Sequence, residues 1–248
     1  MAERVAVVTG AAGHIGRVLV DELSARGYRV TGLDLPAACP DDPRFVGCDL
    51  TDDEAVAALL GGFERIDLLV LSAGLSAIGS LADYDIGVHR KVMDVTHFAA
   101  VSVTLAALPA LRRSHGRIVL IGSVAGFAPV LGRPPYVAAK HAVTGMFTAV
   151  RPELAATGVG LTIVHPTFVE GGMTEVGRTA GASRLTSGAE LTAQDVADAV
   201  LDGIEHGRDL VLIGRTAKQA WTVNRLAPQL YMRLMLRRLR TQRKEAAR

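Results

Sequence analysis

Tyr136 and Lys140 stand four residues apart in the stretch RPPYVAAKHAV, in a chain with few aromatic residues. The two prolines before Tyr136 do not fit a helix interior, whereas 138–143 has a helical pattern, so Tyr136 is expected near a helix start. On a helix the two side chains share one face, where an ammonium favours the phenolate of a tyrosine, whose unperturbed pKa is about 10. The pair can therefore supply an acid and a base. By spacing alone, a half-buried tyrosine beside a solvated lysine is the simpler interpretation.

A glycine-rich turn near the N-terminus predicts a dinucleotide site. A strand pattern over 4–10 ends in TGAAGHIG, where Gly10, Gly13 and Gly16 lead into a helical segment. Such glycines let the backbone approach a pyrophosphate, which then lies at the helix N-terminus. Asp34 ends the second strand, where an acid binds the ribose hydroxyls of NAD and repels the extra phosphate of NADP. The sequence therefore predicts NAD as cofactor, with a simple strand-end turn as the alternative for Asp34.

The elements that must position these residues alternate between continuous apolar segments and helical patterns. Strands are expected within 4–10, 28–34, 66–74, 116–123, 159–166 and 208–214, and helices over 14–26, 52–63, 88–113, 137–157 and 192–206. Another strand precedes Asp49. Strands rich in Val, Ile and Leu that are separated by helices indicate a parallel sheet covered on both faces. We therefore expect an α/β fold, a doubly wound parallel sheet of about seven strands forming one domain over 1–224.

The composition indicates whether the chain can form a core, bind a metal, be secreted or span a membrane. Of the 248 residues, 49% are hydrophobic, enough for a sizeable core. The two cysteines, Cys39 and Cys48, match no metal-ligand spacing and no disulfide framework, so we expect a reducing, cytoplasmic location and no metal site. The first residues run directly into a strand pattern, so no signal peptide is expected. No apolar run reaches the roughly 18 residues needed to span a bilayer.

The last segment, 225–248, carries eight Lys or Arg residues and one acid, a net charge of +7. The remaining 19 basic and 24 acidic residues give the body a charge of −5. Apolar residues at helical spacing among the arginines predict a basic amphipathic helix, which is typical of peripheral contact with a membrane surface. A helix that packs over a substrate cleft or a neighbouring subunit is the interpretation we favour. Nucleic-acid binding is not expected, because the segment has one aromatic residue and the body is acidic.

Ser123 follows the strand at 116–123, and ligands of such sheets bind beyond the carboxyl ends of the strands. Ser123, Tyr136 and Lys140 are therefore expected to meet a nicotinamide in one cleft. With this order of motifs, residues 3–215 resemble the short-chain dehydrogenase/reductase family. The matching stretches are TGAAGHIG, CDL, LSAG, GRIVLIGSVAG, YVAAK and HPTFVEGGM.

The resemblance implies a role for each matching residue. Tyr136 would be the general acid and base, Lys140 would lower its pKa and bind the nicotinamide ribose, and Ser123 would orient the substrate oxygen. Pro166 and Val169 would line the nicotinamide. The residues expected to contact the cofactor are Gly10, Gly13, His14, Ile15, Gly16, Asp34, Asp49, Leu50, Ala73, Gly74, Tyr136, Lys140, Pro166 and Val169. The resemblance also implies a homodimer or homotetramer formed through the helices at 88–113 and 137–157.

One departure from the family concerns the proton relay. The family usually has an asparagine in the long helix before the catalytic strand, whereas this chain has Thr96, in VMDVTHF. Thr96 keeps a hydroxyl and is our fourth catalytic candidate. The relay could instead pass through His97, although a histidine that packs the helix is the interpretation we favour there.

The segment after the sixth strand, about 170–191, is rich in glycine and serine and is expected to act as a lid over the substrate. Apolar candidates for the cleft wall are Phe127, Val130, Leu131, Phe168 and Met173. They favour a small lipophilic alcohol or ketone such as a steroid, retinoid, terpenoid or polyketide. Arg133 and Arg178 would either meet an anionic group or be solvated, and we favour the latter.

The sequence therefore predicts an NAD-dependent oxidoreductase that interconverts a secondary alcohol and a ketone by hydride transfer. A non-catalytic NAD-binding regulator or scaffold remains open because of Thr96. A membrane-surface interaction protein remains open because of 225–248.

Overall fold

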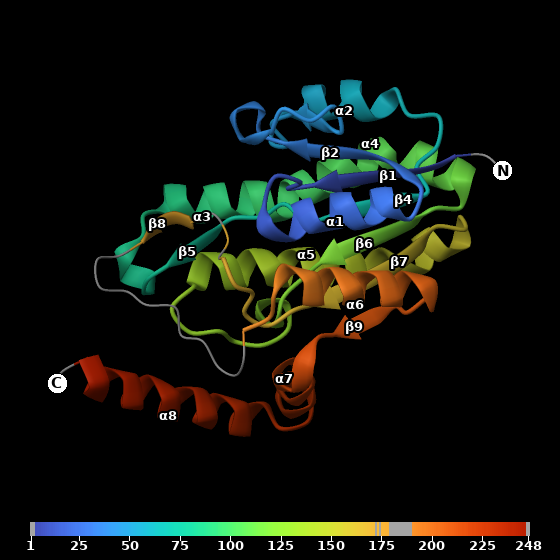
Figure 1. Cartoon of the computed structure of the whole chain (residues 1–248). Helices are drawn as coiled ribbons and strands as arrows, with labels where there is room; N and C mark the ends of the chain where they lie inside the picture. Colours follow the sequence, from blue (N-terminus) through green and yellow to red (C-terminus); the bar gives the residue numbers. More distant parts are fainter. Residues whose placement is uncertain (1–2, 172, 174, 179–189, 247–248) are drawn as a thin grey trace.

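A computed structural model of the chain describes residues 3–171, 173, 175–178 and 190–246. Seven parallel strands form one sheet, in the order β3-β2-β1-β4-β6-β7-β9. These strands are β1 (Arg4–Thr9), β2 (Tyr28–Asp34), β3 (Phe45–Gly47), β4 (Leu68–Leu71), β6 (Arg117–Ile121), β7 (Gly160–His165) and β9 (Leu210–Leu212). The predicted doubly wound parallel sheet is confirmed (Figure 1).

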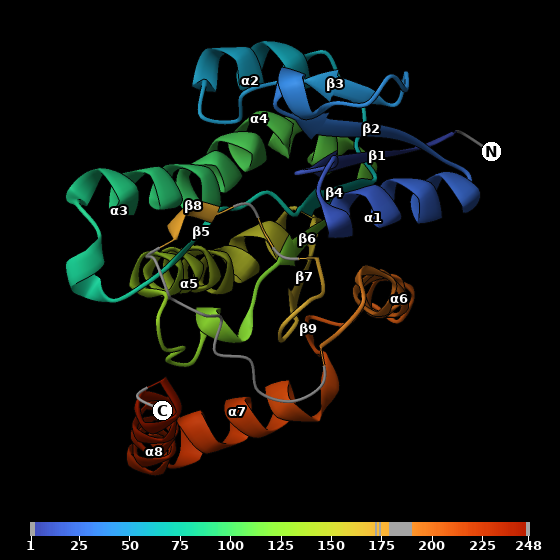
Figure 2. The same cartoon turned by 60° about the vertical axis from the view of Figure 1, so that its left-hand side comes forward.

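Helices cover both faces of this sheet, as Figure 2 shows. On one face lie α1 (His14–Ala25) and α6 (Ala193–Glu205), and on the other lie α2 (Asp53–Gly61), α4 (Ala99–Ser114) and α5 (Pro134–Ala156). Alternate residues of a strand point to opposite faces. Ala6 and Val8 therefore pack with α1, whereas Val7 packs with the helices of the other face. This double burial explains why the strands are apolar throughout.

The helix predicted at 88–113 is longer than expected and interrupted. It consists of α3 (Ile86–Met93), a π-helical turn (Asp94–Phe98) and α4. Over 86–114 it is long and apolar enough to cross a membrane, with a mean hydropathy of 1.4 in its most apolar window. The expectation concerned uninterrupted apolar runs of about 18 residues, and it did not anticipate this helix, which contains charged residues such as Asp94. In the fold, Val103, Ala107 and Leu111 of the helix are buried against the sheet.

Helix α5 carries Tyr136 in its first turn. It begins with Pro134 and Pro135, which are tolerated because the first N–H groups of a helix have no partner within it. Tyr136 and Lys140 are therefore both helical residues, one turn apart.

Three parts of the fold were not predicted as separate elements. β5 (Ser76–Ile78) pairs with β8 (Glu175–Arg178) in a second, two-stranded parallel sheet. Two helices end the chain, α7 (Gly214–Leu226) and α8 (Pro228–Ala246), so the predicted amphipathic helix begins at 228 and not at 225. Short 3-10 turns lie at Pro36–Ala38, Leu81–Asp83 and Val124–Gly126.

Candidate active site

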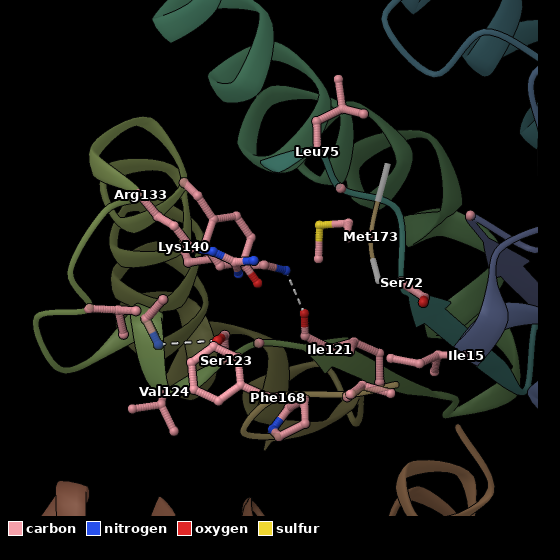
Figure 3. Close-up of a pocket in the computed structure, with 18 of the residues that line it drawn as sticks. Ile15, Ser72, Leu75, Ile121, Ser123, Val124, Arg133, Lys140, Phe168 and Met173 are labelled. Carbon is pink, nitrogen blue, oxygen red and sulfur yellow. Dashed lines mark hydrogen bonds between the residues drawn. The ribbon is translucent and has the colours of Figure 1, made fainter. Parts of the chain in front are cut away.

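The carboxyl ends of the strands open into one cleft with a volume of about 1620 Å³ (Figure 3). All the residues predicted to contact the cofactor line this cleft: Gly10, Gly13, His14, Ile15, Gly16, Asp34, Asp49, Leu50, Ala73, Gly74, Tyr136, Lys140, Pro166 and Val169. Ser123 lines it as well. The cleft therefore joins the glycine-rich turn after β1 to the proposed catalytic residues after β6 and on α5.

The glycine-rich turn needs its glycines for close packing. Gly10 has a φ of +64°, and a Cβ at this position would lie 2.8 Å from the backbone of Ala73. A Cβ on Gly16 would lie 2.1 Å from the carbonyl oxygen of Gly10. Gly13 is the N-cap of α1 and provides no side-chain cap, so the first N–H groups of this helix face the cleft as donors.

Two carboxylates are held in place by backbone groups at the far end of the cleft. Asp34 accepts a hydrogen bond from the N–H of Ala12 at 2.9 Å and another from the N–H of Leu35 at 2.8 Å. The Asp34 carboxylate thus links the end of β2 to the glycine-rich turn. Asp49 accepts from the N–H and the hydroxyl of Thr51, and these bonds lower the pKa of Asp49.

Lys140 is buried, so the interpretation as a solvated lysine beside a half-buried tyrosine was wrong. Only 4% of Tyr136 and 3% of Lys140 are exposed. The ammonium nitrogen Nζ of Lys140 lies 5.9 Å from the centroid of the Tyr136 ring and donates to the carbonyl oxygen of Ile121 at 2.8 Å. Burial lowers the pKa of Lys140 to about 8. The buried ammonium of Lys140 and the phenol of Tyr136 therefore lie close together at the end of β6.

Ser123 lies where the chain leaves β6, opposite α5. Its backbone is extended, and its Oγ accepts a hydrogen bond from the N–H of Ala125 at 3.1 Å. That bond does not use the hydroxyl proton, which can be donated to a substrate oxygen.

Thr96 is buried but does not line the cleft. Its Oγ1 accepts from the N–H of Leu75 at 3.1 Å and lies 3.4 Å from the carbonyl oxygen of Leu75. Thr96 thus connects the π-helical turn to the backbone of Leu75, next to Gly74. The other proposed catalytic residues face the cleft. His97 does not line the cleft either, its Nδ1 has no hydrogen-bond partner among the described residues, and burial lowers its pKa.

Of the apolar residues predicted for the substrate end, four line the cleft: Val130, Leu131, Phe168 and Met173. Phe127 instead packs against Trp221 of α7, with ring centroids 4.9 Å apart. The favoured interpretation of 225–248, a helix that packs over the substrate cleft, agrees with the position of α8. The contribution of α7 was missed, and residues of both helices line the cleft. Their residues in the cleft lining include Ala220, Val223, Tyr231, Leu234 and Met235. The helical spacing of apolar residues in 225–248 is the signal that predicted α8.

Arg133 was expected to be solvated, and this was wrong. It is 8% exposed and lines the cleft. Its guanidinium carbon lies 5.5 Å from the ring centroid of Tyr136 and 6.0 Å from that of Phe168, and stacking on these rings shields it from water. The Arg178 side chain and most of the predicted lid, including 179–189, lie outside the described residues.

Comparison with known proteins identifies the family. Residues 4–181 match the family profile described as short chain dehydrogenase. This chain belongs to the short-chain dehydrogenase family. The mouse dehydrogenase/reductase SDR family member 7B is 30% identical over 97% of this chain and 82% of its own length. An uncharacterized oxidoreductase of Staphylococcus epidermidis is 32% identical over 80% of this chain and 90% of its own length.

Solved structures agree with this assignment. A short-chain dehydrogenase from Burkholderia cenocepacia, determined in complex with NADP, has a TM-score of 0.82 and 28% identity over 94% of this chain and 99% of its own. One from Streptomyces avermitilis has a TM-score of 0.81 at 22% identity over 97% of this chain and 99% of its own, which shows the fold alone. As a short-chain dehydrogenase, this chain is an oxidoreductase of a family that binds a nicotinamide cofactor.

The residues of the cleft fit such a cofactor. The uncapped N-terminus of α1 suits a pyrophosphate, and the oriented carboxylate of Asp34 suits ribose hydroxyls. Among the described residues, no group of three or more His, Cys, Asp or Glu side chains could hold a metal ion.

Proposed function

We propose that this short-chain dehydrogenase interconverts a secondary alcohol and a ketone on a lipophilic small molecule, with NAD as cofactor. The observation that carries the proposal is the cleft, in which Asp34 and the glycine-rich turn lie at one end and Ser123, Tyr136 and Lys140 lie at the other. Beyond Ser123, apolar residues of the 130–131 segment and of α7 and α8 continue the wall. A bound nicotinamide supplies or accepts the hydride.

The chain's own residues would bind the reacting oxygen and move its proton. In the oxidative direction, the Tyr136 phenolate would take the hydroxyl proton of the substrate alcohol, and a bound nicotinamide would supply the acceptor for the carbinol hydride. Ser123 donates its free hydroxyl proton to the substrate oxygen and orients it. Lys140, held by the Ile121 carbonyl, keeps a positive charge one helical turn from Tyr136 and favours the phenolate.

The choice of NAD over NADP rests on Asp34. Its carboxylate is fixed by two backbone N–H groups at the end of β2, where the ribose hydroxyls of the adenosine half would bind. A fixed negative charge there repels a ribose phosphate. The Burkholderia cenocepacia relative was solved with NADP, so cofactor choice is a property to measure for each chain.

The experiment that tests this function follows the absorbance of reduced nicotinamide with NAD and a pool of lipophilic secondary alcohols, with Tyr136→Phe in parallel. We expect turnover that Tyr136→Phe abolishes while its NAD affinity is retained. Binding of NAD without turnover on a widened panel of alcohols and ketones would instead favour the non-catalytic scaffold. Thr96→Asn restores the family's residue, so turnover that appears only in this variant would show that the relay had been lost.

We also propose peripheral membrane contact through 225–248. Five large apolar side chains are exposed on this part of α7 and α8: Leu226, Leu230, Met232, Leu234 and Leu236. Arg233 lies between them and Arg225, Arg237 and Arg238 flank them, and such a mixture suits an anionic lipid surface. We expect the full chain to sediment with anionic vesicles and not with zwitterionic ones. Sedimentation that survives deletion of 225–248 would exclude this segment as the contact.

We further propose a homodimer or homotetramer formed through the long helices of one face. Phe98 and Leu105, on the π-helical turn and α4, are 57% and 66% exposed. An exposed apolar face of this kind is typical of a subunit interface. Light scattering during size-exclusion chromatography should give a multiple of the chain mass, and Leu105→Glu should lower it.

A further inference from the structure

His165 is a buried histidine that lies beside Ser123 at the carboxyl end of β7. It is 1% exposed and does not line the cleft. Its Nδ1 lies 2.8 Å from the carbonyl oxygen of Ser123 and 3.1 Å from the backbone nitrogen of the same residue. One neutral tautomer donates to the carbonyl, and the other accepts from the N–H. In either tautomer the imidazole is hydrogen-bonded to the Ser123 backbone.

The imidazole of His165 is the hydrogen-bond partner of the Ser123 backbone, where a neighbouring strand would otherwise supply a backbone group. On one side of Ser123, Gly122 donates its N–H to the carbonyl oxygen of Val164 at 2.7 Å. On the other side, Val124 donates to the carbonyl oxygen of Pro166 at 3.2 Å. Between these two backbone bonds, the side chain of His165 on the facing segment bonds the extended backbone of Ser123. Buried backbone groups need such partners, so this bond fixes the serine.

Gly122 makes room for the ring. A Cβ at this position would lie 2.6 Å from Nδ1 and 2.8 Å from Cε1 of His165, closer than carbon atoms approach without displacement. The glycine before the serine therefore allows the imidazole to lie directly against the backbone that it bonds.

Helix α7 holds the other side of the ring. The Phe127 ring meets the His165 ring edge-on, with centroids 5.0 Å apart, and the Trp221 ring lies 6.3 Å from the His165 ring. Asn224 donates to the carbonyl oxygen of Phe127 at 2.7 Å, which anchors the segment after Ser123 to the same helix. The imidazole is therefore clamped between the serine backbone and α7.

The ring stays neutral under assay conditions. Burial, with a smaller contribution from the Lys140 charge, lowers the pKa of His165 to about 4 against the opposing effect of its bond to Ser123. A neutral ring keeps the same hydrogen bond across the working range of pH.

We propose that His165 is a positioning residue that acts through Ser123: it fixes the Ser123 backbone so that the Ser123 hydroxyl points at the substrate oxygen. This inference rests on the function proposed above, because Ser123 needs a fixed direction only if it binds a reacting oxygen. His165 does not touch the cleft, so its effect on turnover must pass through the serine.

The test is a double-mutant cycle with His165→Leu and Ser123→Ala. In the wild-type background, His165→Leu should lower kcat/KM by roughly 10- to 100-fold, because a misplaced donor loses most of its contribution to the transition state. In the Ser123→Ala background the same substitution should cost less than about twofold. His165→Asn places an amide near the position of Nδ1 and should restore most of the activity.

Thr162→Val is the matched control. Thr162 is also buried on β7, but its hydroxyl donates to the carbonyl oxygen of Arg208 at 2.7 Å, away from Ser123. It should destabilise the fold without changing kcat/KM. An equal loss from His165→Leu in both backgrounds, or no loss in the wild-type background, would overturn the proposal.

A second measurement does not depend on turnover. Hydrogen–deuterium exchange over 122–125 should accelerate in His165→Leu and return toward wild type in His165→Asn. Unchanged exchange in His165→Leu would overturn the proposal even if no substrate is found. Wild-type protein without turnover, but with this exchange pattern, would instead count against the proposed function alone.

Discussion

The ammonium of Lys140 donates to the backbone carbonyl of Ile121 at 2.8 Å and lies 5.9 Å from the ring centroid of Tyr136. This bond ties the second turn of α5 to the last residue of β6. It also holds a buried cation whose charge depends on pH near neutrality, because burial lowers its pKa to about 8.

Cofactor affinity should therefore depend on the charge of Lys140. The ammonium form is lost as pH rises through about 8, so we expect NADH affinity to fall by about tenfold or more above this pH, the contribution of a hydrogen bond to a charged group. Fluorescence titration of NADH measures it. Lys140→Met should bind weakly with little dependence on pH, whereas Tyr136→Phe should keep the wild-type profile. A wild-type profile in Lys140→Met would assign the titration to another group.

The same lysine should reduce the stability of the fold. Its pKa is about 8 in the folded chain and near 10.5 when unfolded, so the folded state releases its proton first. The cost of burying the ammonium is fully present below pH 8 and is relieved as pH rises toward 10.5. At neutral pH, Lys140→Met should unfold with a free energy higher by up to about 3 kcal/mol. Urea denaturation at several pH values should show this advantage shrinking above pH 8.

Asp34→Asn should change cofactor preference. Removing the charge weakens the bonds to the ribose hydroxyls and the repulsion of a ribose phosphate, so the ratio of NADP to NAD affinity should rise by about tenfold or more. Calorimetric titration with both cofactors measures this ratio. Asp49→Asn neutralises another carboxylate of the same cleft and should change the two affinities together. An unchanged ratio of NADP to NAD affinity in Asp34→Asn would show that another residue selects the cofactor.

Thr96→Val should destabilise the π-helical turn. Its hydroxyl is the acceptor for the N–H of Leu75, and valine leaves this N–H without that bond, at a cost of about 1–3 kcal/mol. Urea denaturation measures the loss, and Thr96→Ser, which keeps the hydroxyl, should lie near wild type. Equal stability of Thr96→Val and wild type would show that the bond contributes nothing.

Deletion of 228–248 should impair substrate binding more than cofactor binding. Helix α8 covers Ala128 and Ala220 with Tyr231 and Met235, and the Tyr231 hydroxyl donates to the carbonyl oxygen of Pro129. Without this wall, KM for a lipophilic substrate should rise by about tenfold, since each buried side chain is worth about 1.5–3 kcal/mol. NAD affinity should stay near wild type. Met235→Ser, a milder change, should raise KM in the same direction.

Much of the site followed from the sequence, because local patterns report local structure. Along the sequence, the spacing of apolar residues changes where a strand gives way to a helix. These changes placed the glycine-rich turn, Asp34, Ser123 and the Tyr136–Lys140 pair at the carboxyl edge of a parallel sheet. These positions depend on neighbours in the chain, since side chains repeat every two residues in a strand and about every 3.6 in a helix.

Only the tertiary structure decided which of these groups are buried and what they bond. The sequence allowed Lys140 and Arg133 to be solvated, and both are buried in the cleft. It also placed Thr96 among the catalytic candidates, whereas Thr96 bonds the backbone of Leu75 and does not reach the cleft. Helix α8 was predicted as an amphipathic helix that packs over the substrate cleft or a neighbouring subunit, but its contact with Ala128 was not predicted. Burial and hydrogen-bond partners depend on residues far apart in the chain, which no local periodicity records.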